Sequence, residues 1–87
     1  MIIENRQEGA ELASRLLRYP VDEAFEFSED VPEIDAFFYW QPIRGGTQLL
    51  VGRDGTVMFG ISSLTLDEMV TMFADGERTE LSEFEVE

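Results

Sequence analysis

Cysteine, histidine and lysine are absent from this chain of 87 residues. Without cysteine, the chain forms no disulfide and offers no thiolate to a metal ion. These three residue types are also the usual general bases and nucleophiles of enzymes, so we expect a protein that is not an enzyme and has no catalytic residue. The glycine patterns that hold nucleotide phosphates are missing as well, and we expect no cofactor.

Positive charge is scarce. Six arginines stand against 19 aspartates and glutamates, and the net charge is −13. Binding to nucleic acid phosphates or to an anionic membrane surface requires clustered basic residues, so we expect neither partner. The chain also lacks a basic leader and a run of the ~20 apolar residues that a bilayer requires. We therefore expect a cytoplasmic protein.

The acidic excess leaves two interpretations open. A basic protein partner could be attracted to this surface, and its association would then depend on salt. The same charge could instead serve solubility, or adaptation to high salt, without any partner. Hydrophobic residues make up 44% of the chain, which is enough for one modest core. The length predicts a single domain over residues 1–87.

The clearest local signals are those of two helices, one near each end. Asn5 followed by Glu8 forms a capping-box pattern, and Pro20 should end the helix over residues 6–18. Thr65 followed by Glu68 repeats the pattern before a helix over residues 66–74.

Strands are expected between the helices, and Asp54-Gly55 is a strong hairpin-turn signal. The acidic stretch 28–35 should be a loop; it lacks the spacing of a calcium-binding loop, and we expect no metal site. Residues 77–87 should form an acidic tail, either flexible or added to the sheet as a short strand; alternatively its apolar side chains fold back over the open face of the sheet. Alternating or aromatic segments predict strands at residues 23–28, 36–41, 47–51 and 56–61.

Strands flanked by helices indicate the α+β class. We expect an antiparallel sheet of about four strands, with the N-terminal helix and the C-terminal helix on one face. The other face would then be open. If Phe38 and Trp40 point into the core, other large side chains point outward. The predicted partner-binding surface combines these apolar residues with an acidic rim: Phe37, Tyr39, Leu50, Met58, Glu29, Asp30 and Glu33.

From Gly45 onward the chain resembles the YrhB-like immunity-protein family. The resemblance is carried by a glycine-led strand, an acidic-glycine turn, a second strand and a helix that opens with leucine and acids. It implies a cytoplasmic protein that binds and neutralises a toxin, often a basic nuclease. The matching residues are Gly46, Leu50, Val51, Asp54, Gly55, Val57, Leu66, Asp67 and Glu68.

Together these patterns favour a non-catalytic interaction module of the immunity or inhibitor type that binds a basic protein partner such as a toxin. One alternative is a small homodimeric accessory or structural protein that uses the open sheet face. Another is an inhibitor that mimics DNA, with carboxylates at phosphate-like spacing.

Overall fold

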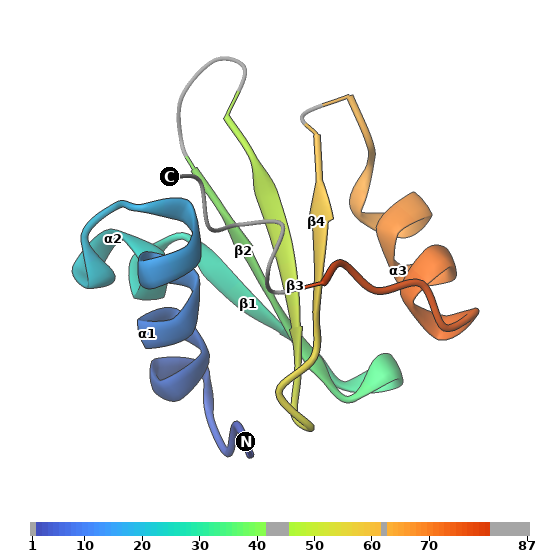
Figure 1. The fold of residues 1–87 in the computed structure, drawn as a ribbon, viewed down its shortest axis with the longest axis horizontal. Coiled ribbons are helices and arrows are strands. Elements are labelled where there is room, and N and C mark those ends of the chain that lie inside the picture. The colour runs from blue at the N-terminus through green and yellow to red at the C-terminus, as the bar shows by residue number, and fades with distance from the viewer. Residues whose placement is uncertain (1, 42–45, 62, 81–87) are drawn as a thin grey trace.

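The computed structural model describes residues 2–41, 46–61 and 63–80. A four-stranded sheet stands between α1 and α2 on one side and α3 on the other (Figure 1). In chain order the elements are α1 (Arg6–Leu17), α2 (Val21–Glu26), β1 (Ser28–Val31), the short 3-10 helix η1 (Pro32–Ile34), β2 (Ala36–Trp40), β3 (Gln48–Gly52), β4 (Val57–Gly60) and α3 (Leu66–Ala74).

The strands follow one another in space in the order β1-β2-β3-β4, and every neighbouring pair is antiparallel. The predicted α+β class is therefore confirmed, with an antiparallel sheet of four strands and a helix near each end. The hairpin turn also lies where the sequence predicts it. Gly55 has a φ of 89°, and Asp54 Oδ1 accepts hydrogen bonds from Thr56 N at 3.0 Å and Thr56 Oγ1 at 2.7 Å. These two bonds lower the pKa of Asp54.

The two helices do not share a face of the sheet, which corrects the predicted arrangement. α1 and α2 pack on the face that carries Tyr39 and Leu49, while α3 packs on the face that carries Leu50 and Met58. The reason lies in β2 and β3, whose apolar residues are consecutive and so supply both faces of the sheet. A strand of this kind is stable only when both of its faces are covered.

Both predicted helix starts are confirmed. Asn5 Oδ1 accepts a hydrogen bond from Glu8 N at 2.9 Å, and Glu8 Oε1 accepts one from Glu4 N at 2.8 Å. At α3, the Thr65 and Glu68 side chains each accept a hydrogen bond from the backbone N–H of the other residue. Such caps satisfy backbone donors that a helix leaves free, which is why short patterns locate helix ends well.

The predicted strand at residues 23–28 is wrong, because this stretch forms α2 instead. The alternation of Phe25, Glu26 and Phe27 resembles a strand pattern. Pro20 and the acidic first turn decide otherwise: Pro20 O accepts from Ala24 N at 3.0 Å, and Asp22 lies at the positive end of the helix dipole. Phe25 is left 37% exposed on the outer side of α2.

The predicted loop at residues 28–35 is also wrong, since β1 and η1 occupy most of it. An edge strand tolerates charged side chains, and an acidic edge strand therefore carries little strand signal in the sequence. Of the predicted tail, Thr79 pairs with Val57 of β4 through a hydrogen bond from Thr79 N to Val57 O at 2.8 Å. Leu81, Phe84 and Val86 lie outside the described residues.

Candidate partner-binding surface

The four apolar residues of the predicted binding surface are all buried. Phe37 is 5% exposed, Tyr39 and Leu50 are 0% exposed, and Met58 is 3% exposed. The prediction that they form an open docking face is therefore wrong. A partner could reach none of these side chains without unfolding part of the chain.

The register of the sheet explains the error. Phe37 lies opposite Val51, whereas Leu50 lies opposite both Phe38 and Met58. Directly paired residues of antiparallel strands point to the same face, so the four predicted residues divide between two faces. Phe37 and Tyr39 belong to the core under α1, and Leu50 and Met58 to the core under α3.

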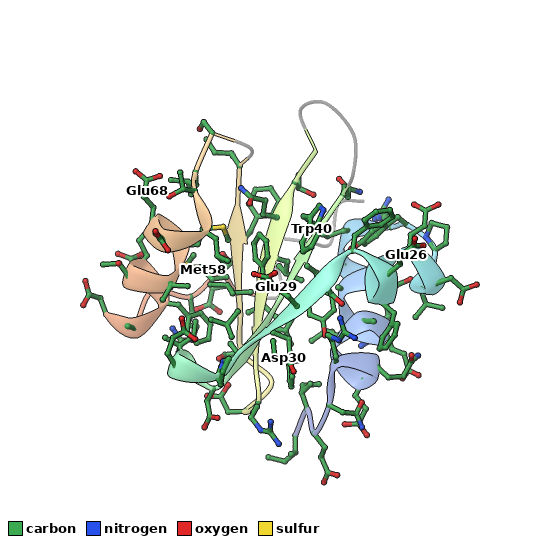
Figure 2. All side chains as sticks on the ribbon, turned by 180° about the vertical axis from the view of Figure 1, so that it is seen from behind. Glu26, Glu29, Asp30, Trp40, Met58 and Glu68 are labelled. Carbon is green, nitrogen blue, oxygen red and sulfur yellow. The ribbon has the colours of Figure 1, made fainter. Side chains whose placement is uncertain are left out.

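The three acidic residues of the prediction are exposed. Glu29 and Asp30 lie in the middle of β1, and Glu33 lies in η1. Glu29 is paired with Phe38 and so stands on the α3 side, while Asp30 is paired with Phe37 and stands on the α1 side. Figure 2 looks onto β1 and shows Glu29 and Asp30 along it.

β1 forms an edge of the sheet, and its outward backbone groups are only partly occupied. Trp40 N donates a hydrogen bond to Phe27 O at 3.2 Å, so Phe27 and Trp40 form a hydrogen-bonded pair of the antiparallel ladder. Such pairs alternate with pairs that are not hydrogen-bonded, and the N–H and C=O groups of Ser28 and Asp30 therefore point away from β2. Arg6 Nη1 donates to Ser28 O at 3.0 Å. The peptide groups of Asp30 thus face the open edge. At the opposite edge, which is formed by β4, an outward backbone group is occupied, because Phe59 N donates a hydrogen bond to Thr79 Oγ1 at 2.9 Å.

A groove lies next to β1 on its α3 side. Its volume is about 320 Å³, and Trp40, at the end of β2, is partly exposed in it. The indole stacks on Phe38 with ring centroids 5.3 Å apart, and meets Phe27 edge-on at 6.3 Å. The groove is lined by Glu29, Phe38, Trp40, Gln41, Gly46, Thr47 and Gln48.

Sequence reasoning missed this groove because it treated Trp40 as a core residue. The available signal was the position of the single tryptophan at the last place of an aromatic strand, two residues before a proline. Tryptophan often has one side in the core and the other in water, so an end position favours partial exposure.

Both tyrosines of the chain have raised pKa values. Desolvation by burial, with a smaller effect of the Glu23 carboxylate, raises the pKa of Tyr19 to about 12. Burial also raises the pKa of Tyr39, against the opposing effect of Arg6. The Tyr39 hydroxyl donates a hydrogen bond to Arg6 O at 2.7 Å, whereas the Tyr19 hydroxyl is buried without a hydrogen-bond partner among the described residues.

We expect these shifts to make the fold sensitive to alkali. An unfolded tyrosine ionises near pH 10.0, while folded Tyr19 keeps its proton until about pH 12. The contribution of the raised Tyr19 pKa to the free energy of unfolding is therefore fully present below pH 10 and is lost between about pH 10 and pH 12. Urea unfolding at several pH values should show this fall, and Tyr19→Phe should reduce it. An equal fall in wild type and Tyr19→Phe would contradict the assignment to Tyr19.

No group of three or more aspartate and glutamate side chains in the described ranges is arranged to hold a metal ion. The helices of these same ranges include none with the length and apolar content needed to cross a bilayer. Comparisons of the chain with protein families, with curated proteins and with solved structures found no match. We therefore base the function on the charge and geometry of β1, η1 and the adjacent groove.

Proposed function

We propose that this protein is a non-catalytic interaction module that binds a basic protein partner through β1 and η1. The observation that carries the proposal is the set of exposed carboxylates of Glu29, Asp30 and Glu33 along an open sheet edge. A basic partner would meet these charges before contact, which speeds association and makes it salt-dependent.

The open edge adds a second kind of contact. The peptide groups of Asp30 face outward, and an extended segment of a partner can donate to and accept from such groups as an added strand. Acidic side chains on an edge strand also protect against aggregation, and that role would need no partner. If the acids bind a partner, their position on the surface matters for binding a cationic ligand. If they only protect against aggregation, their position does not matter for such binding.

A homodimer is less well supported than a basic partner. The residues of the face that a dimer was expected to use are covered, Phe37 and Tyr39 by α1 and Leu50 and Met58 by α3. Pairing of β1 with β1 of a second copy would bring the carboxylates of Glu29 and Asp30 close to their counterparts, and like charges across a strand pair are destabilising.

An immunity role is the finer form of this proposal. The resemblance to YrhB-like immunity proteins suggests that the basic partner is a toxin, and an acidic surface of this kind suits a basic nuclease. Neutralisation would then follow from covering the toxin's cationic surface, and it would need no catalysis by this chain.

The location of the acids can be tested with two triple variants that remove the same amount of charge. The first is Glu29→Gln, Asp30→Asn and Glu33→Gln, and the matched control is Glu11→Gln, Glu77→Gln and Glu80→Gln, all exposed positions. The ligand is a short blocked peptide of alternating glycine and arginine, titrated at low and moderate salt by calorimetry.

We expect the first triple to weaken binding at least about fivefold, because three exposed ion pairs each contribute up to about 1 kcal/mol. The control triple should weaken it less than about twofold. Equal losses in the two triples would mean that only net charge matters, and the proposed surface would be wrong.

A further inference from the structure

The groove beside β1 has the composition of a receptor for one cationic side chain. We infer that it receives an arginine of the basic partner, with the guanidinium stacked on Trp40 and paired with the Glu29 carboxylate. This inference rests on the proposed function and specifies it, because it names the anchor of the partner. The other residues that matter are Phe38, which supports the indole, and the two glutamines that form the walls.

The ring of Trp40 is suited to a cation. Tryptophan has the most favourable ring for cation–π contact, and the planar guanidinium of arginine stacks on it better than an ammonium does. Contact with Phe38 at 5.3 Å and with Phe27 at 6.3 Å holds the indole in place, so little side-chain freedom remains to be lost on binding.

The chain already pairs its own arginines with aromatic rings in three other places. Those guanidinium groups are engaged away from the groove, and none of the described arginines lies over the indole of Trp40. The three pairs are Arg6 over Phe25 at 4.5 Å, Arg53 over Phe37 at 5.7 Å and Arg78 over Phe73 at 3.5 Å.

A carboxylate stands on the same side of the sheet as the indole. Glu29 is paired with Phe38, and two positions along the ladder Phe27 lies opposite Trp40. Both pairs therefore face the α3 side, as the ring contact between Phe27 and Trp40 confirms. A guanidinium over the indole would lie within the field of the exposed Glu29 carboxylate.

The walls of the groove are held by hydrogen bonds. Gln48 Nε2 donates to Ile61 O at 2.8 Å and to Leu64 O at 2.9 Å. Gln41 Oε1 accepts from Thr47 Oγ1 at 2.8 Å. These bonds fix both amides, so the groove exists before the partner arrives.

The size of the groove favours a side chain over a cofactor. At about 320 Å³ it lies at the lower end of the ~300–1,000 Å³ range of small-molecule pockets. A flat guanidinium with its methylene stem needs little depth, since one side stacks on the indole and the rest remains near water. The positive charge of arginine is complementary to the net charge of −13.

The single tryptophan makes the groove observable in the intact protein, because all tryptophan emission comes from Trp40. We would titrate the full chain with the glycine–arginine peptide, and in parallel with a glycine–lysine peptide of equal charge. The variants are Glu29→Gln and the matched control Glu11→Gln, which removes the same charge from an exposed position on α1. Trp40→Leu, checked for folding by circular dichroism, is followed by calorimetry.

We expect the arginine peptide to change the Trp40 emission in a saturable way and to bind several-fold more tightly than the lysine peptide. Glu29→Gln should weaken the binding of the arginine peptide roughly three- to tenfold, and Glu11→Gln should weaken it less than about twofold. Trp40→Leu should abolish the preference for arginine over lysine.

Salt-sensitive binding that leaves the Trp40 emission unchanged, with equal effects of Glu29→Gln and Glu11→Gln, would overturn the arginine site and leave the acidic surface standing. If neither peptide binds at low salt, the proposed function fails, and the arginine site fails with it.

Discussion

Gly9→Ala should destabilise this protein by roughly 1–3 kcal/mol. The sign of this change in stability is informative, because a glycine-to-alanine change in an exposed helix interior stabilises a protein by about 1 kcal/mol. Gly9 lies inside α1, directly over Tyr39 of β2. A Cβ atom at this position would overlap the Tyr39 hydroxyl oxygen and lie 2.9 Å from its Cζ. Tyr39 is 0% exposed and its hydroxyl is bonded to Arg6 O, so the ring has no free space into which it can move.

Urea unfolding of Gly9→Ala, Tyr39→Phe and the double variant would measure this contact. Tyr39→Phe alone should cost about 1–2 kcal/mol, since Arg6 O loses its donor. In the Tyr39→Phe background, Gly9→Ala should cost less than in wild type, because the overlapping oxygen is gone. Gln7→Ala, at an exposed position of the same helix, is the control and should change the stability by less than about 0.5 kcal/mol. A Gly9→Ala protein more stable than wild type would show that α1 does not lie this close to the sheet.

Leu50→Ala should lower the free energy of unfolding by about 2–5 kcal/mol. Leu50 is 0% exposed, lies between Phe38 and Met58 in the sheet, and belongs to the core beneath α3 that also contains Met69. Removing its side chain leaves a cavity that rigid strands on both sides cannot easily fill.

The matched control is Ile61→Ala, which also shortens an aliphatic side chain just after β4. Ile61 is 57% exposed, so we expect a loss below about 1 kcal/mol. Urea unfolding and the dispersion of amide signals in NMR spectra would measure both variants. Equal, small losses of unfolding free energy for the two variants would mean that α3 leaves this face of the sheet open. The sheet could then offer an apolar docking face after all.

Features that depend on neighbouring residues were predictable. The Thr65–Glu68 capping box and the Asp54-Gly55 turn each join atoms within three residues of one another, so the pattern of side chains determines the local geometry. The exposure of Glu29 and Asp30 was predictable for a different reason, because an unpaired carboxylate is very costly to bury.

The face to which each apolar residue points was not predictable in the same way. Tyr39 and Leu50 had been placed on one open face, but they lie on opposite faces and both are covered. A usable signal was present, since β2 and β3 lack the alternation of a strand with one wet face. The partial exposure of Trp40 had a weaker signal, namely its place at the end of β2.

The sequence by itself determined the α+β class, the helix starts, the hairpin turn and the acidic character of the surface, because propensities, caps and charge act over a few residues. Only the tertiary structure decided that α1 and α3 cover opposite faces, that the segment after Pro20 is helical, and that Glu29 of β1 lines the Trp40 groove. These features depend on contacts between segments far apart in the chain. The hydrophobic effect rewards burial of apolar area in any orientation. The local sequence pattern alone therefore does not choose among the ways in which the helices can pack on the sheet.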